Sequence, residues 1–266
     1  QSESMMRSLM ERCAKLGKVL AAHCEDDRLV RGGYIHDGAW AAAHGHRGIC
    51  SESEWGPIAR DVRLARETGC AYHVCHISCR ESAQIIRQAK KEGVNVTCET
   101  APHYLLLDEN DLQDDGRFRM NPPLRSKGSS DVCSSDLLDG TIDAIATDHA
   151  PHSAEEKGRG LAGSAFGVVG LECAFPVLYT ALVKTGILSL DRLIHLMALA
   201  PRQRFDIPLW EGDRCEWDLE AVEEIDPARF LSKGKATPFA GRMVYGRCLR
   251  TEHAGSVTYE AEATVK

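Results

Sequence analysis

The chain has 266 residues, of which 43% are hydrophobic and 27% are charged, a composition typical of globular proteins and not of disordered or collagen-like chains. Its 39 acidic residues outnumber its 32 lysines and arginines, which gives a net charge of −7 and argues against a nucleic-acid partner. No apolar run approaches the roughly 18 residues of a membrane span, so we expect a cytoplasmic protein without a membrane partner. The 11 scattered cysteines indicate reduced thiols, and Cys75 and Cys79 lack the second pair that a structural zinc site needs.

Helical and strand patterns alternate from the first residues onward. Apolar residues at three- and four-residue spacings predict a helix over residues 6–16, which Gly17 ends, and an apolar run then predicts a strand at residues 18–23. The same pattern recurs, with helices expected at residues 54–67 and 81–91 and strands at residues 70–76, 94–99 and 142–147. Strict alternation of this kind implies βαβ crossovers and a parallel sheet.

All four predicted strands end in polar residues, which favours a TIM-type barrel with its active site at the carboxyl ends of the strands. A closed barrel needs eight strands. The chain is therefore either a fragment or an open sheet, and a start in mid-helix without an initiator Met favours the fragment. A doubly wound open sheet remains an alternative, although no glycine-rich phosphate loop follows any strand. We predict an α/β fold: the C-terminal half of a TIM (β/α)8 barrel, with about four βα units, over residues 1–207.

The texture of the sequence changes after residue 207. Short apolar segments at residues 241–249 and 256–264 predict strands, so residues 208–266 are expected to form part of a small β-rich domain. Within the barrel portion, residues 128–137 (GSSDVCSSDL) are rich in Ser and Asp and predict a surface loop.

Three residues at strand ends have the chemistry of a catalytic zinc site. His23, His76 and Asp148 follow three different predicted strands, and each strand of a barrel would deliver one ligand toward the axis. Neutral imidazole and carboxylate both suit zinc, which activates water for attack on an amide at neutral pH. A single histidine at a strand end is more often a structural hydrogen-bonding group, but the joint pattern favours a metal site. Asp148 could also accept a proton from the activated water.

Other polar segments allow both a functional and a structural interpretation. Asn121 precedes two prolines and could present its amide to a ring amide or carboxylate, although the pattern alone favours a rigid turn. His152 is a candidate substrate contact or a solvated side chain. Residues 44–47 (HGHR) suggest a metal and anion motif, yet they lie in a connection, so we expect a solvated loop. The glycine-rich residues 158–170 either close over a substrate or form a plain surface loop.

These motifs together resemble the type I dihydroorotases of the amidohydrolase superfamily, relatives of hydantoinases and allantoinases. The resemblance covers nearly the whole chain, and NPPLR together with TDHAPH is specific within the superfamily. It rests on AHCED at 22–26, HVCHIS at 73–78, TCETAPHYLLL at 97–107, MNPPLRS at 120–126, DGTIDAIATDHAPH at 139–152, FGVVGLE at 166–172 and TPFAGR at 237–242.

The resemblance implies a role for each matching residue. His23 and His76 would be metal ligands from the fifth and sixth barrel strands, and Asp148 would be both a ligand and the catalytic acid and base. One or two Zn²⁺ ions would support the reversible cyclisation of N-carbamoyl-L-aspartate to L-dihydroorotate in pyrimidine biosynthesis. Partners suggested by the family are the small-molecule substrate, a second copy in a homodimer, and aspartate transcarbamoylase. The substrate contacts would be Asn121, His152, Phe166 and Gly167.

Two features depart from the family. Its first four strands, with the HxHxR motif, a substrate-binding Asn and an acidic ligand, have no counterpart here, so we expect this chain alone to be inactive or weakly active. Residues 128–137 replace a charged helical stretch, which we interpret as a sequence-assembly artefact. Two alternatives stay open: a hydantoinase- or allantoinase-type hydrolase, and a non-catalytic dihydroorotase-like partner of aspartate transcarbamoylase, which would be expected to lose its ligands.

Overall fold

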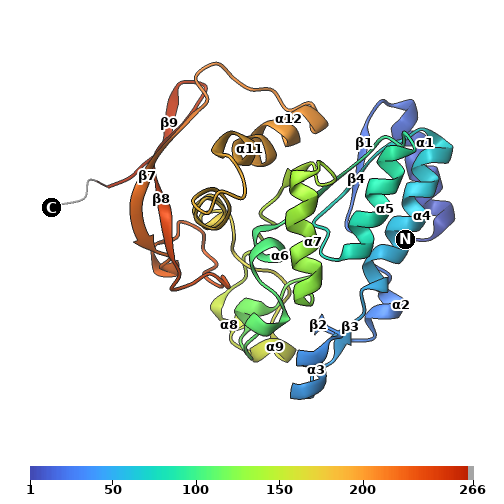
Figure 1. Ribbon diagram of the computed structural model, residues 1–266, viewed down its shortest axis with the longest axis horizontal. Helices are drawn as coiled ribbons and strands as arrows, with labels where there is room; N and C mark the ends of the chain where they lie inside the picture. Colours follow the sequence, from blue (N-terminus) through green and yellow to red (C-terminus); the bar gives the residue numbers. More distant parts are fainter. Residues whose placement is uncertain (263–266) are drawn as a thin grey trace. The chain divides into compact units, whose positions relative to one another are not determined.

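The computed structural model describes residues 1–262, with the side chains of all of these except residues 129–134 (Figure 1). The chain forms two compact units. One comprises Gln1–Leu171 and Leu231–Pro238, and the other comprises Glu172–Phe230 and the described chain from Phe239 onward. These two units are defined by contacts between residues and not by function. The predicted division into a barrel portion, residues 1–207, and a β-rich domain, residues 208–266, therefore stays a prediction. Among the described residues, no helix combines the length and the apolar character that a membrane span requires.

The first unit contains the predicted parallel sheet. Its strand order is β1-β4-β5-β6, and every neighbouring pair is parallel. The register aligns Ala21 with His73 and His73 with Thr97. The four predicted strands are thus confirmed, with shorter bounds than expected: β1 Val19–Ala22, β4 Ala71–Val74, β5 Val96–Thr100 and β6 Ala144–Ile145.

Three amphipathic helices pack against this sheet and against one another, as Figure 1 shows: α1 Glu3–Lys15, α4 Glu52–Thr68 and α5 Arg80–Lys91. The predicted glycine stops are confirmed at two of them, since Gly17 after α1 and Gly69 after α4 have φ of 61° and 68°. Burial along β5 alternates, with Val96, Cys98 and Thr100 buried and Thr97 and Glu99 partly exposed. One face of the sheet therefore packs on helices, while the other carries polar side chains.

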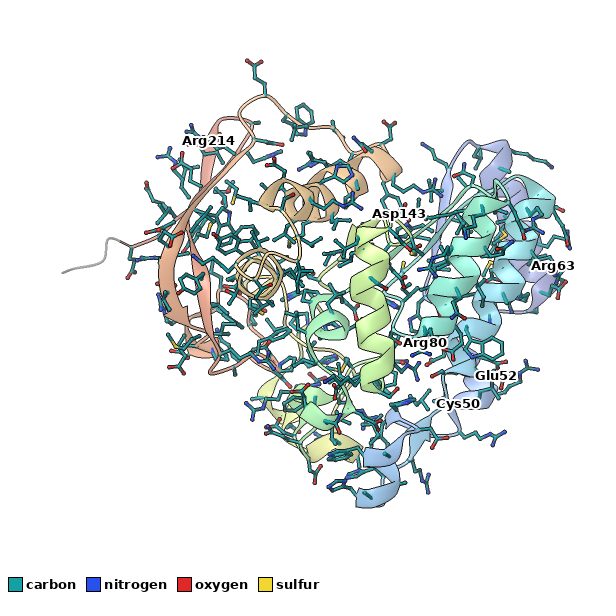
Figure 2. The ribbon with its side chains drawn as sticks, in the orientation of Figure 1. Cys50, Glu52, Arg63, Arg80, Asp143 and Arg214 are labelled. Carbon is teal, nitrogen blue, oxygen red and sulfur yellow. The ribbon has the colours of Figure 1, made fainter. Side chains whose placement is uncertain are left out.

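The loop predicted at residues 128–137 is wrong, because these residues lie in helix α7, Lys127–Leu138. The helix packs against α5 and α6 (Pro102–Leu106). Leu137 and Asp136 are buried, and Asp136 forms an ion pair with Arg87 of α5. At the start of α7, the carbonyl of Gly128 accepts a 3.0 Å hydrogen bond from Nη2 of Arg80 in α5, which Figure 2 labels. Tertiary contacts of this kind override the weak helix propensity of a Ser- and Asp-rich segment.

The connections of the first unit contain short elements: α2 Asp27–Val30, β2 Ile35–His36, α3 Ala39–His44, β3 Gly48–Ile49, α8 Ala154–Lys157 and α9 Gly160–Gly163. Residues 45–47 lie in the connection between α3 and β3, as expected, whereas His44 is the last residue of α3. His44 is exposed, but His46 is half-buried and its Nδ1 lies 2.9 Å from the hydroxyl of Tyr34. The expectation of a fully solvated loop is therefore wrong for His46, which packs beside Trp40.

The second unit combines helical segments with a three-stranded antiparallel sheet of order β7-β8-β9. The strand predicted at 241–249 is confirmed as part of β8, Met243–His253. The one predicted at 256–264 is confirmed as β9, Ser256–Glu260, and its last residues lie outside the described ones. Strand β7, Arg214–Glu224, was not predicted, because charged residues interrupt its apolar pattern. The helical elements are α10 Ala174–Leu178, α11 Leu190–Ile194 and α12 Ala200–Phe205, with π-helical turns at Tyr179–Val183 and His195–Leu199.

Candidate metal and substrate site

The two histidines predicted as ligands lie side by side at the carboxyl ends of neighbouring strands. His23 directly follows β1, and His76 lies just past β4. Nδ1 of His23 is 3.1 Å from Nε2 of His76, and the ring planes meet at 63°. Two nitrogens bound at about 2.0–2.1 Å to a tetrahedral zinc ion lie roughly 3.3 Å apart. The facing nitrogens therefore fit two ligands of one metal ion.

Asp148, the third predicted ligand, lies within electrostatic range of this pair, but the ligand atoms of the three residues do not all come within 4.8 Å of one another. It follows β6, and its carboxylate interacts electrostatically with both imidazoles. Burial raises the pKa of the Asp148 carboxyl and the nearby Glu99 raises it further, while His76 and His23 lower it; the net pKa is above the usual value. A carboxylate with a raised pKa takes up a proton more readily, which suits an acid and base.

The backbone at two of these residues is left-handed. His76 has a φ of 37° and Asp148 has a φ of 47°. Non-glycine residues reach this region at a cost of about 1–2 kcal/mol each. Such strain often occurs at functional sites, where surrounding structure holds the residue in place. At His76 and Asp148, the left-handed conformation changes the direction of the chain just past the end of the strand.

Glu25 joins the histidine pair to Asn121, a contact that sequence reasoning missed. One carboxylate oxygen of Glu25 lies 3.7 Å from Nε2 of His23, and the other accepts a hydrogen bond of 2.7 Å from the side-chain amide of Asn121. Glu25 raises the pKa of His23, and His23 and the Asn121 amide lower the pKa of Glu25. The spacing His23-x-Glu25 is the only sequence signal for this link, since Asn121 is 96 residues away.

A second group of metal-ligand residues lies on the same sheet: His73, Cys75 and Glu99 offer ligand atoms within 4.8 Å of one another. Nε2 of His73 is 3.1 Å from a carboxylate oxygen of Glu99. Like His23 and Asp148, Glu99 is a potential ligand near the carboxyl end of a parallel strand. Cys79, in contrast, is buried beside Glu54 and takes no part in this group.

The predicted substrate contacts after Asp148 form their own cluster. Nε2 of His152 donates a 2.7 Å hydrogen bond to the carbonyl of Phe166. Gly167 has a φ of +125°, and a Cβ there would lie only 2.6 Å from Cβ of Ala150. Glycine is required at this position, because the segment passes directly over the chain that leads from Asp148 to His152. The structure thus brings His152, Phe166 and Gly167 together.

A buried ion pair holds the segment that carries Asn121. Arg125 is 2% exposed and Glu54 is 3% exposed, and their charged groups lie 3.3 Å apart. Arg125 also donates to the hydroxyl of Ser78 at 3.0 Å and to the carbonyl of Ile49 at 3.1 Å. The turn at Asn121 contains a cis peptide bond to Pro122. Arg125 thus holds this segment in place while the side chain of Asn121 reaches Glu25, so the structural and the functional interpretation of Asn121 can both hold.

Comparison with known proteins shows what this chain is similar to. Residues 1–82 match a family model described as dihydro-orotase-like. The chain is 48% identical to a dihydroorotase of Brevibacillus brevis over 98% of its length and 50% identical to one of Shouchella clausii over 98%. It spans 63% of the length of each of these relatives.

Solved structures support the same fold. An L-hydantoinase from Arthrobacter aurescens is 28% identical and superposes with a TM-score of 0.86, covering 98% of this chain and 61% of its own. A D-hydantoinase from Thermus sp. has the same TM-score at 23% identity, over 98% of this chain and 61% of its own, and shows the fold alone. The mixed α/β fold with a parallel sheet is thus confirmed. Taken together, these matches show that the chain is similar to dihydroorotases over nearly its whole length and matches a dihydro-orotase-like family model over residues 1–82.

Proposed function

We propose that this chain supplies the catalytic aspartate and part of the metal and substrate site of a dihydroorotase. The reaction would be the reversible conversion of N-carbamoyl-L-aspartate into L-dihydroorotate and water. The observation that carries the proposal is the pair of facing nitrogens of His23 and His76, 3.1 Å apart, with Asp148 within electrostatic range of both imidazoles. The finer fold assignment, the C-terminal half of a (β/α)8 barrel with part of a small β domain, belongs to the same proposal.

The proposed metal is zinc, bound as one or two ions. His23, His76 and Asp148 would hold it, since two imidazoles and a carboxylate are a donor set that zinc accepts. Zinc supplies Lewis acidity, which polarises an amide carbonyl and makes water a stronger acid.

Asp148 would move the proton. In the direction of ring opening, its carboxylate takes a proton from the attacking water and delivers it to the ring nitrogen as the amide bond breaks. In the direction of ring closure, it takes a proton from the carbamoyl nitrogen and returns it to the departing water. A carboxylate suits both roles, because the group must bind and release a proton within one cycle.

Substrate binding would fall to Asn121, His152, Phe166 and Gly167. The side-chain amide of Asn121 has donors and an acceptor that complement a ring amide. His152 fixes the carbonyl of Phe166, which supports a defined backbone shape at the contact.

The identity of 46–50% to dihydroorotases supports this function over a hydantoinase activity, since the hydantoinase structures compared are 19–28% identical. The non-catalytic alternative is disfavoured because His23 and His76 face each other at 3.1 Å and Asp148 is retained. A cytoplasmic location, a homodimer and association with aspartate transcarbamoylase stay predictions.

The test uses the complete gene product that contains this sequence. Zinc content and hydrolysis of dihydroorotate, hydantoin and allantoin are measured for the wild type, Asp148→Ala and the control Asp27→Ala, which changes an exposed aspartate of α2. We expect bound zinc, turnover of dihydroorotate, loss of that turnover in Asp148→Ala, and no change in Asp27→Ala. Turnover of hydantoin or allantoin alone would support the hydantoinase-type reading, and a zinc-free, inactive protein would support the non-catalytic one.

A further inference from the structure

Lys157, the last residue of α8, is a lysine that is 6% exposed. Its ammonium group donates to three main-chain carbonyls, those of Arg119 at 3.0 Å, Ala165 at 2.7 Å and Gly167 at 2.6 Å. An ammonium group has three N–H donors. Every donor therefore has a neutral acceptor, and the side chain is fixed at its tip.

The three carbonyls belong to the two segments that carry the proposed substrate contacts. Ala165 and Gly167 flank Phe166, and Arg119 lies two positions before Asn121. The N–H of Gly167 donates to the same Arg119 carbonyl at 3.0 Å. Lys157 thus cross-links two stretches of backbone that are distant in sequence and meet at the site.

The side chain of Arg119 strengthens the same junction. Its guanidinium lies over the Phe166 ring, 4.3 Å from the ring centre, and its Nη1 donates to the carbonyls of Leu161 and Ala162 at 2.6 Å. Two cations therefore lie close together around Phe166 with main-chain carbonyls as their acceptors. Burial and the neighbouring Arg119 lower the pKa of Lys157 to about 8, although Asp115 acts in the opposite direction. Burying a charge in this way is costly for the fold, so a role in the site is the simpler reason for it.

We propose that Lys157 is a positioning residue, which fixes the Phe166–Gly167 backbone against the segment carrying Asn121 so that the substrate contacts keep one spacing. This inference rests on the proposed dihydroorotase function. Lys157 itself touches neither the proposed metal ligands nor the reacting atoms. Its loss should therefore weaken substrate binding and leave the metal site intact.

The experiment compares Lys157→Met, which keeps the length of the side chain and removes its donors, with Lys157→Gln, which keeps a shorter polar group. Lys91→Met, at the exposed end of α5, is the matched control. In the zinc-loaded gene product, we expect KM for dihydroorotate to rise about tenfold in Lys157→Met, which is ~1.4 kcal/mol. We expect kcat to change by less than about threefold, as for loss of uniform substrate binding. Zinc content and KM should be unchanged in Lys91→Met.

Amide hydrogen exchange gives a second measurement that does not depend on catalysis. Exchange in residues 165–168 should become faster in both Lys157 variants, while exchange in β4 and β5 stays at the wild-type rate. If the wild type does not turn over dihydroorotate but the exchange difference appears, the proposed function fails and the positioning role stands. Wild-type KM together with wild-type exchange in Lys157→Met or Lys157→Gln would overturn the inference. If amides in β4 and β5 also exchange faster in one of the two Lys157 variants, that variant has lost its fold. The result for the other Lys157 variant then decides whether the inference holds.

Discussion

Replacing Arg125 with methionine isolates the contribution of the buried ion pair. Methionine has a similar length and no donors, so Arg125→Met leaves the Glu54 carboxylate buried without its counter-charge. Removing one partner of such a pair costs about 3–5 kcal/mol. Five other groups still donate to Glu54: the main-chain N–H and the hydroxyl of Ser78, the main-chain N–H and the thiol of Cys79, and the hydroxyl of Ser82. We therefore expect a loss near the lower bound, about 3 kcal/mol in the free energy of unfolding.

The pH dependence of this loss follows from the pKa of Glu54. Burial raises this pKa, but Arg125 and the hydrogen bonds from Ser78 and Ser82 lower it more, so its net value in the folded protein is below the usual one. In the wild type, Glu54 stabilises the fold above the pKa of the unfolded state, about 4.3, and this stabilisation is lost as the pH falls through the folded pKa. In Arg125→Met, burial dominates and raises the folded pKa. The variant should then lose stability as the pH rises above about 4.3.

Urea unfolding followed by circular dichroism, at about pH 4.5 and about pH 8, measures both effects. The deficit of Arg125→Met should be small at the lower pH and near 3 kcal/mol, as a rough value, at the higher pH. Adding Glu54→Gln should recover more than half of it. Arg63, labelled in Figure 2, forms an exposed ion pair with Glu3, and Arg63→Met should cost under about 1 kcal/mol. An equal deficit at both pH values, or one below about 1 kcal/mol at pH 8, would refute the reasoning.

In the complete gene product, four further outcomes are expected. Gly167→Ala should lower kcat/KM about tenfold or more and reduce the melting temperature, since its Cβ would meet Ala150. The control is Gly186→Ala, which has a φ of +79° and open space around it and should change stability alone. In the wild type but not in Lys157→Gln, KM should rise as the pH passes about 8, where Lys157 loses its proton. Urea unfolding should show stability increasing from about pH 8 toward 10.5, because the unfolded lysine binds its proton more tightly. Dialysis against a chelator should remove zinc and dihydroorotate hydrolysis together, and added zinc should restore both.

The parts of the fold that the sequence predicted are those encoded locally. Strands β1, β4, β5 and β6 are apolar runs bounded by glycine or by polar residues, so each carries its own signal. Helix α7 lacks such a signal, because its stability depends on buried contacts of Asp136 and Leu137 with distant helices. Strand β7 was missed because acidic residues interrupt its apolar pattern, among them the exposed Asp218, Glu220 and Glu224.

The candidate site divides in the same way. His23, His76 and Asp148 could be identified because parallel strands bring their carboxyl ends to one edge. Glu25 and Lys157 could not, because their importance depends on partners far along the chain. The amide of Asn121 is 96 residues from Glu25, and the carbonyl of Arg119 is 38 residues from Lys157. A lysine in a glycine-rich, charged stretch also gives no sign that it will be buried.

At His76 and Asp148, the left-handed backbone lowers the stability of the fold, while the side chain supplies chemistry that glycine lacks. Glycine would adopt these conformations without the steric cost of a Cβ, so a chain selected for stability alone would gain from substitution at both positions. A lineage that had abandoned catalysis would be free to make that exchange. Histidine and aspartate at these two positions therefore lower the stability of the fold where glycine would not, which marks both as positions whose side chain matters more than the backbone cost.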